Sequence, residues 1–127
     1  MGIKHYKYTR QLRLLTSADF KQVFDEPVCT LRREIRLIAR LNGLDHPRLG
    51  FVLAKKRMKR AVDRNRLRRQ IRENFRLNQD KLAGFDIVIL ANERSATVEP
   101  EQLRICLNKF WQELGAVYNS LCGDRKP

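Results

Sequence analysis

The spacing of apolar residues changes several times along the chain, and each change marks the border of an expected helix or strand. Phe20 and Phe24 stand four positions apart, between the capping residue Thr16 and the pair Glu26–Pro27, which predicts a short helix over 17–25. Residues 28–32 and 34–42 predict two strands, because apolar and polar side chains alternate through most of the second one. The turn-forming run NGLDHP at 42–47 separates them from a third strand over 49–54.

The stretch from Lys55 to Arg76, KKRMKRAVDRNRLRRQIRENFR, predicts one long helix with two unlike faces. At about 100° per residue, Leu67, Ile71 and Phe75 fall within an arc of roughly 80°, which is typical of a face that packs on a core. The opposite arc, of roughly 100°, offers no acidic partner to its basic side chains. Guanidinium groups bind phosphates in a bidentate manner and stack on bases, so this arc predicts contact with a nucleic acid. Its members are Asn65, Arg68, Arg69, Arg72 and Arg76.

The C-terminal part of the chain predicts one more strand and one more helix after a loop over 78–84. The run DIVILA at 86–91 is short, apolar and β-branched, as in a central strand that is buried on both faces. Pro100 is placed to open the last helix, whose apolar stripe fits either packing on its own sheet, which we favour, or a coiled-coil seam. The stripe consists of Leu103, Leu107, Phe110, Leu114, Val117 and Leu121.

The order of these elements, αβββαβα, predicts the fold class. We expect a single α+β domain over residues 1–127, built as a two-layer sandwich in which helices cover one face of a mixed four-stranded sheet. The basic segment 1–12 is expected to be a flexible arm and residues 122–127 a disordered tail.

The net charge of the chain limits the kinds of molecule that the protein is expected to bind. The formal net charge is +13 and the isoelectric point is about 10.4, which favours a polyanion, either a nucleic acid or an anionic membrane surface. Between Arg48 and Arg76, twelve Lys and Arg stand against only Asp63 and Glu73, so ten of the thirteen surplus charges fall in this part. Such a concentration favours a binding site over a charge that serves solubility alone. The chain lacks an apolar run that could span a bilayer and a signal-peptide pattern, so we expect a cytoplasmic protein without a membrane partner.

Residues that could carry out catalysis or hold a metal are sparse. Cys29, Cys106 and Cys122 are odd in number and widely spaced, unlike a disulfide framework or a zinc site. The two histidines, at positions 5 and 46, fall in the expected arm and in a turn, and Asp63 and Glu73 stand too far apart to share a metal. Acid–base cleavage of RNA usually needs two placed groups. We therefore expect no catalytic residue and no bound cofactor or metal in the protein itself.

The second face of the sheet is expected to be partly open. Arg36, Ile38 and Arg40 would line it, with Phe20 or Phe24 at its edge. Arginine beside exposed aromatic rings suits single-stranded nucleic acid, because bases stack on the rings while arginine follows the backbone. Periodicity alone favours the alternative in which both phenylalanines belong to the core.

The residues of the basic stretch resemble the signature of the bacterial ribonuclease P protein subunit. The resemblance lies in Lys55–Lys56, Ala61–Val62, Arg64–Asn65–Arg66, Arg68–Arg69 and Arg72. The N-terminal pattern Arg13–Leu14, Asp19–Phe20 and Val23–Phe24 is similar to that of the family, and so is Pro47–Arg48–Leu49–Gly50 leading into Ala54–Lys55–Lys56. With the last strand and helix, the resemblance covers roughly residues 13–114.

The resemblance implies a subunit of an endoribonuclease that removes the 5′ leader of precursor tRNA by hydrolysing one phosphodiester bond. In that family an RNA subunit and its divalent metal ions, usually Mg²⁺, carry the chemistry, and the protein binds that RNA, here expected at 1:1, together with the leader. The residues implied to contact the catalytic RNA are Lys55, Lys56, Lys59, Arg60, Arg64, Asn65, Arg66, Arg68, Arg69 and Arg72. The residues implied to form the leader cleft are Phe20, Phe24, Arg36, Ile38, Arg40 and Val52, which reverses the core interpretation for Phe20 at least. The resemblance also implies a left-handed crossover at the basic helix, where the general rule predicts the opposite hand.

Two other functional classes share part of this pattern. A ribosome-associated or general RNA-binding protein would have the basic helix and the charge, but it would not require the N-terminal aromatic pair and the RNR segment together. A nuclease acting alone would cleave its substrate RNA as a purified protein, without any RNA subunit.

Overall fold

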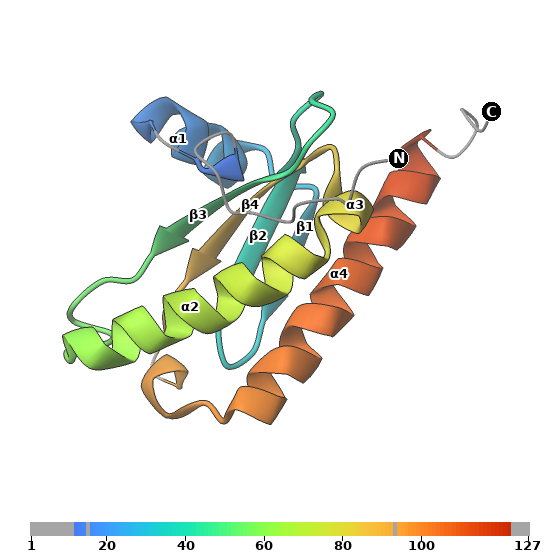
Figure 1. Cartoon of the computed structure of the whole chain (residues 1–127). Helices are drawn as coiled ribbons and strands as arrows, with labels where there is room; N and C mark the ends of the chain where they lie inside the picture. The colour runs from blue at the N-terminus through green and yellow to red at the C-terminus, as the bar shows by residue number, and fades with distance from the viewer. Residues whose placement is uncertain (1–11, 15, 93, 123–127) are drawn as a thin grey trace, which may run out of the picture.

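One four-stranded sheet and two long helices that pack on it form the body of the molecule (Figure 1). The computed structural model describes residues 12–14, 16–92 and 94–122, so the predicted arm and tail lie outside the described residues, apart from Leu12 and Cys122. None of the helices in these ranges is long and apolar enough to cross a membrane. In chain order the elements are α1 (Ser17–Asp25), β1 (Cys29–Arg32), β2 (Arg36–Leu41), β3 (Arg48–Val52), α2 (Ala61–Leu77), α3 (Gln79–Leu82), β4 (Phe85–Leu90), η2 (Ser95–Thr97) and α4 (Pro100–Cys122).

The sheet is mixed, with the strand order β1-β2-β4-β3. Strand β2 pairs antiparallel with β1 and with β4, whereas β3 pairs parallel with β4. Strand β4 therefore has neighbours on both edges, and its residues from Phe85 to Ile89 are buried. This confirms the predicted central strand, and the α+β fold class is confirmed with it.

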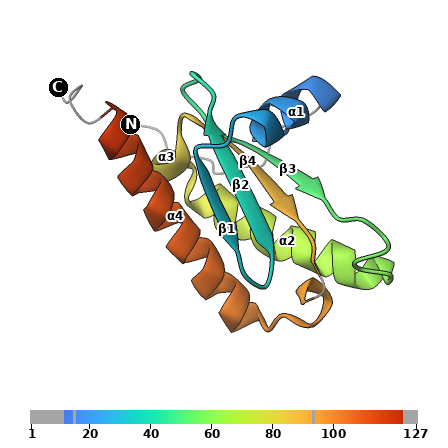
Figure 2. The same cartoon turned by 180° about the vertical axis from the view of Figure 1, so that it is seen from behind.

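The parallel connection from β3 to β4 runs through α2 and is left-handed. In Figure 1 both strands run toward the lower left, β3 lies to the upper left of β4, and α2 passes in front of the sheet. Figure 2, seen from behind, shows the sheet in front of α2. Almost all connections of this kind are right-handed, so the hand here agrees with the family resemblance and opposes the general rule.

Helices α2 and α4 bury their apolar stripes against the same face of the sheet. Phe75 of α2 and Phe110 of α4 are fully buried in one core cluster with Leu37 and Ile87 of the strands. Trp111 of α4 also donates its indole N–H to the side-chain oxygen of Asn74 on α2 at 2.6 Å. The stripe from Leu103 to Leu114 is thus covered by its own domain, so the interpretation that we favoured is confirmed over a coiled-coil seam. The side chain of Leu121 lies outside the described residues.

Helix α1 lies on the opposite face of the sheet, so the expectation of helices on one face holds for α2 and α4 but not for α1. Its first turn is capped as predicted, because the Asp19 N–H donates to the hydroxyl of Thr16 at 3.1 Å. Val23 is fully buried against Ile38 and Val88 of the sheet. This second cluster is small, so α1 is attached by much less apolar surface than α2 or α4.

The segment just before α1 is anchored to β3. Arg13 forms an isolated parallel bridge with Leu49, and the Leu14 N–H donates to the Leu49 carbonyl at 3.1 Å. Leu12 packs in the main core, whereas Leu14 packs in the small cluster under α1. The segment therefore follows the edge of the sheet and contributes to both faces, and the expected arm cannot extend as far as Leu12.

The stretch between α2 and β4, which was expected to be a loop, contains the short helix α3. Leu82 of α3 is fully buried in the main core. The single apolar side chain that anchors this turn of helix is too weak a periodic signal to be recognised in the sequence.

Gly50 in β3 allows the ring of Phe20 to lie directly on the strand. A Cβ atom at this position would stand 2.6 Å from Cζ of Phe20 and 3.0 Å from Cβ of Leu14. We expect Gly50→Ala to displace the Phe20 ring and to lower the free energy of unfolding by about 1–3 kcal/mol, as overpacking does. Chemical denaturation would measure this change.

The matched control for Gly50→Ala is Gly115→Ala. A Cβ at Gly115 meets nothing within 4 Å, and the residue lies inside α4. Removing a helical glycine there should raise stability by about 0.5–1 kcal/mol. Equal effects at the two positions would contradict the close approach of Phe20 to β3.

Candidate nucleic-acid interface

Helix α2 has the two faces that its sequence predicts. Leu67, Ile71 and Phe75 are all at most 2% exposed on the sheet side. The other side carries exposed Asn65 and Arg69 and partly exposed Arg68 and Arg72. The Arg68 guanidinium donates to the side-chain oxygen of Asn65 at 3.2 Å, so these two residues lie together on the outer surface.

The C-terminal end of this outer face has an acidic neighbour, which corrects the expectation that it has none. Arg76 forms an ion pair with Glu73 one turn before it, and its Nε also donates to Glu73 at 3.2 Å. The same hydrogen bond lowers the pKa of the Glu73 carboxyl. The part of the face without such a pair on the same helix is therefore centred on Arg68 and Arg69 and does not extend to Arg76.

The helix begins at Ala61, so the prediction that it begins at Lys55 is wrong. The N–H groups of Arg57 and Met58 donate to the Ala54 carbonyl at 3.0 and 3.1 Å, which makes a turn directly after β3. Met58 is only 1% exposed, and burying it in the main core bends the chain away from a helical path. The basic residues of this loop remain exposed: Lys55, Lys56, Arg57, Lys59 and Arg60.

Two arginines of the RNR segment bind the protein's own backbone. Arg64 donates through Nη1 to the carbonyls of Met58 at 2.7 Å and Lys59 at 3.1 Å, which holds the basic loop against the first turns of α2. Arg66 donates to the Ala96 carbonyl in η2 at 3.1 Å and pairs with Asp63 at 3.4 Å. Both were predicted only as RNA contacts, and the structure gives each of them a structural contact as well.

A surface suited to binding RNA therefore combines the outer side of α2 with the loop before it. We call it the α2 basic face and define it by Lys55, Lys56, Lys59, Arg60, Asn65, Arg68, Arg69 and Arg72. Clustered Lys and Arg on one face of a domain favour the phosphate backbone of a nucleic acid, because each contact releases condensed counterions.

Helix α1 presents aromatic side chains on the other face of the sheet. Phe24 is 40% exposed, and Phe20 is partly buried over Gly50. A shallow hollow on this helix is lined by Thr16, Ser17, Phe20, Lys21 and Phe24. Of the two rings, Phe24 is the more available to stack on a base.

Two residues that were predicted to lie in the cleft are placed beneath α1. Ile38 is 2% exposed and packs with Val23 and Val88, so its side chain does not form an open cleft floor. Arg40 donates to Gln22 on α1 at 3.4 Å and to Glu26, the C-cap residue of α1, at 3.5 Å. The physical reason is the same for both, because α1 covers the part of β2 that the strand pattern alone left open.

The open part of this face lies further along the strands, toward the start of α2. Arg36 of β2 and Val52 of β3 are both in register with Leu90 of β4, so the three side chains cross the sheet in one row. This row lies in a pocket of about 180 Å³ lined by Arg32, Arg36, Val52, Ala54, Lys56, Arg57, Leu90, Ala91 and Asn92. Arg36 and Val52 were predicted to lie here, whereas Arg32, Arg57 and Leu90 were missed.

Strand alternation could have identified Leu90, which shares a face with Val88, but the register across β4 was needed to place it beside Arg36. We call the row of Arg36, Leu90 and Val52, together with the pocket around it, the sheet cleft. Lys56 and Arg57 of the basic loop line it, so the loop borders both the sheet cleft and the α2 basic face.

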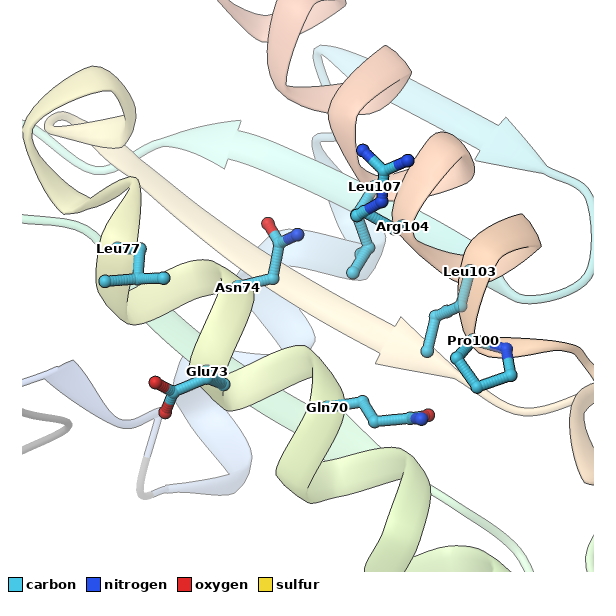
Figure 3. Close-up of a pocket in the computed structure, with 8 residues that line it drawn as sticks. All are labelled: Gln70, Glu73, Asn74, Leu77, Pro100, Leu103, Arg104 and Leu107. Atoms are coloured by element: carbon cyan, nitrogen blue, oxygen red, sulfur yellow. The ribbon is translucent and has the colours of Figure 1, made fainter.

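A third depression lies between α2 and α4 (Figure 3). Its apolar floor includes Leu103 and Leu107, and Leu77 at its rim is 59% exposed. The charged residues beside it are paired within their own helices, Glu73 with Arg76 and Arg104 with Glu101. This depression is therefore apolar with paired charges beside it, whereas the α2 basic face and the sheet cleft are lined by several basic side chains.

The described residues offer few groups for acid–base or nucleophilic chemistry. In residues 12–14, 16–92 and 94–122, no three His, Cys, Asp or Glu side chains are grouped so that they could hold a metal ion. His46 lies in the β2–β3 turn with its Nδ1 3.0 Å from the Asp45 carboxylate. Burial raises the pKa of the Cys29 and Cys106 thiols, which disfavours the reactive thiolate.

Comparisons of the sequence and of the structure with known proteins both point to one protein family. The family profile described as Ribonuclease P matches residues 8–115. This chain belongs to the Ribonuclease P protein family. The Ribonuclease P protein component of Ectopseudomonas mendocina is 46% identical over 121 residues, which cover 94% of this chain and 90% of that protein.

Solved structures of Ribonuclease P proteins have the same fold. The protein from Thermotoga maritima superposes with a TM-score of 0.67 at 34% identity, covering 79% of this chain and 96% of that one. The protein from Staphylococcus aureus gives a TM-score of 0.71 at 26% identity, covering 80% of this chain and 94% of that one. Since this chain is similar to Ribonuclease P proteins over most of their length, it is a subunit of an endoribonuclease whose partner is the Ribonuclease P RNA.

Proposed function

We propose that this protein docks on the Ribonuclease P RNA through the α2 basic face and holds the 5′ leader of precursor tRNA in the sheet cleft, beside Phe24. The observation that carries the proposal is the position of the basic loop, whose Lys56 lines the cleft while the loop itself leads into α2. One loop thus joins two surfaces with different chemistry, as a protein that bridges a catalytic RNA and its substrate requires.

Docking through α2 is supported by the way in which the helix is held. Its inner residues are fully packed, so the outer arginines project from a rigid support. Arg64 holds the preceding loop in place through two backbone carbonyls. A pre-ordered basic surface loses less conformational entropy on binding than a flexible one.

Leader binding in the sheet cleft is supported by its mixture of side chains. Arg32 and Arg36 supply positive charge, and Val52 and Leu90 supply an apolar floor. Phe24 adds an exposed ring on the neighbouring helix. This combination suits a single strand, whose backbone is followed by arginine while its bases contact apolar and aromatic surfaces.

The reaction proposed for the complex is hydrolysis of one phosphodiester bond, which gives the mature 5′ end of tRNA. Divalent metal ions, usually Mg²⁺, held by the RNA subunit would supply the activated water and stabilise the developing charge. The protein's part is to bind and orient both RNAs in a 1:1 complex with the RNA subunit.

Reconstitution tests the proposed function. Mixed with a bacterial Ribonuclease P RNA at low Mg²⁺, the protein should increase cleavage of precursor tRNA at the 5′ leader junction. The protein alone should leave the precursor intact. Cleavage by the RNA-free protein would instead indicate an autonomous nuclease. Failure to stimulate the RNA, with no preference for it over an unrelated structured RNA, would indicate a general RNA-binding protein.

Replacing Phe24 with alanine tests the leader site. We expect the Kd of the reconstituted enzyme for leader-bearing precursor to rise about tenfold, because stacking of one base on an aromatic ring contributes about 1–3 kcal/mol. The Kd for mature tRNA, which has no leader, should stay unchanged. Filter binding with the two substrates measures both values.

The matched control for Phe24→Ala is Leu44→Ala. Leu44 is 41% exposed, close to the value for Phe24, but it lies in the β2–β3 turn away from the sheet cleft. This variant should bind both substrates like the wild type. Equal losses for substrates with and without a leader in Phe24→Ala would rule out a leader-specific role.

A further inference from the structure

A buried ion pair on the α1 side of the sheet connects the sheet to the helix that carries the aromatic residues. Asp86 of β4 is completely buried. Arg48 of β3, its register partner, donates through Nε to Oδ1 at 2.8 Å and through Nη2 to Oδ2 at 2.7 Å. Asn42 donates to Oδ1 at 2.9 Å. The carboxylate is therefore satisfied, and the Arg48 guanidinium is fixed in orientation by two parallel hydrogen bonds.

The remaining terminal nitrogen of Arg48 faces α1. Its Nη1 lies 3.6 Å from Oδ2 of Asp19, in the first turn of that helix. The Asp19 and Arg48 side chains are only 24% and 22% exposed, so solvent screens this pair less than a surface ion pair. Hydrogen bonding to Asp86 also raises the pKa of Arg48, which keeps its charge fixed.

A second arginine from the same row of the sheet holds the other end of α1. Arg40 of β2 is also in register with Asp86, and it contacts Gln22 and Glu26 at the C-terminal end of the helix. Between these two polar contacts the helix buries only Val23 completely. The partly buried Phe20 adds to this apolar contact, and the two arginines together with these two side chains fix the orientation of α1.

We propose that Arg48, fixed by Asp86 and paired with Asp19, is a positioning residue that sets the orientation of α1 and thereby the distance of Phe24 from the sheet cleft. This inference rests on the proposed leader site. Asp19 immediately precedes Phe20, whose ring lies over Gly50, two residues after Arg48 in β3. A change at the ion pair is therefore transmitted over a short path to the aromatic rings of α1.

Asp19→Asn is the decisive variant, because it removes the charge while keeping the shape of the side chain and the backbone cap. In enzyme reconstituted with Ribonuclease P RNA, we expect KM for leader-bearing precursor to rise about threefold, with kcat unchanged. Affinity for the RNA subunit and for mature tRNA should stay within about twofold of wild type. Asp19→Glu, which restores the carboxylate, should recover most of the loss.

The matched control is Asp25→Asn on the same helix. Asp25 pairs within α1, with Lys21 at 2.5 Å, and both side chains are mostly exposed. Both substitutions remove one negative charge from α1. If net charge alone governed binding, each would strengthen the affinity for RNA, so a loss in Asp19→Asn with a gain or no change in Asp25→Asn isolates the contact to Arg48.

Arg48→Lys provides a second, independent variant. Lysine keeps the charge but cannot bind both oxygens of Asp86 and reach Asp19 in one fixed geometry, so KM for the leader-bearing substrate should rise about tenfold. Thermal unfolding of each variant shows whether the fold persists at the assay temperature. Asp19→Asn, at a partly exposed site, keeps the test valid if Arg48→Lys does not fold.

The outcomes separate this inference from the proposed function. If the wild-type protein does not favour leader-bearing substrate, the leader site itself is wrong. If the wild type does favour it and Asp19→Asn behaves like Asp25→Asn, the leader site stands and the positioning role of Arg48 is refuted. Parallel losses for precursor and mature tRNA would also refute it.

Discussion

Replacing both Arg68 and Arg69 with alanine is expected to weaken binding to Ribonuclease P RNA by roughly 100-fold. Each charge-assisted hydrogen bond to phosphate contributes about 1–3 kcal/mol, and 1.4 kcal/mol corresponds to a tenfold change in Kd. Both residues lie on the outer side of α2, away from Leu67 and Ile71, so the fold should persist. The two losses should add to within about 0.5 kcal/mol if the contacts are independent.

The salt dependence of the same binding reaction gives a second measurement. Because phosphate contacts release counterions, the slope of log Kd against log salt should decrease by about one to two for the double variant. A matched control is Arg104→Ala with Lys109→Ala, which removes two exposed basic side chains from α4. If both double variants bind Ribonuclease P RNA with the same Kd, the α2 basic face contributes only through the net charge of the protein and not through contacts of its own.

Phe75→Ala is expected to lower the free energy of unfolding by about 3–5 kcal/mol, the usual range for a buried phenylalanine replaced by alanine. Phe75 is fully buried where α2 packs on the sheet and α4, so truncation leaves a cavity that surrounding side chains cannot fill. The melting temperature should fall by on the order of 10 °C. Thermal unfolding followed by circular dichroism measures it.

The control for Phe75→Ala lies two residues away. Leu77 is 59% exposed on the same helix, and Leu77→Ala should change stability by less than about 0.5 kcal/mol. Phe75→Ala should also weaken RNA binding as α2 loses its support, and lowering the temperature should restore part of that loss. Equal stability of the two variants would contradict the predicted inner face of α2.

Much of the fold could be predicted because its periodic signals are local. The bounds of α1 follow from Thr16 as a cap and from Glu26–Pro27 as a stop, and the structure places the helix at Ser17–Asp25. The buried run in β4 and the apolar stripe of α4 could be identified for the same reason. The start of α2 could not, because burial of Met58 is a tertiary effect that overrides the helical propensity of a Lys- and Arg-rich segment.

The candidate site was predictable in its residue types and only partly in its geometry. Arg36 and Val52 lie in the sheet cleft as expected, whereas Ile38 and Arg40 lie beneath α1. A strand pattern assigns side chains to two faces but does not show which part of a face another element covers. Arg32 and Leu90 were missed because their place depends on the register of β1, β2 and β4.

The sequence by itself determined that this protein has a basic, two-faced helix, an α+β core and the family to which it belongs. These properties depend on residue type and on spacing within one element. Only the tertiary structure decided that Arg64 and Arg66 of that helix also hold the protein's own backbone, Arg66 while its side chain stays exposed. It also decided that α1 covers Ile38 and that Arg48 connects Asp86 to Asp19. Such contacts join residues that are distant in the chain, so they exist only once the sheet has brought those residues together.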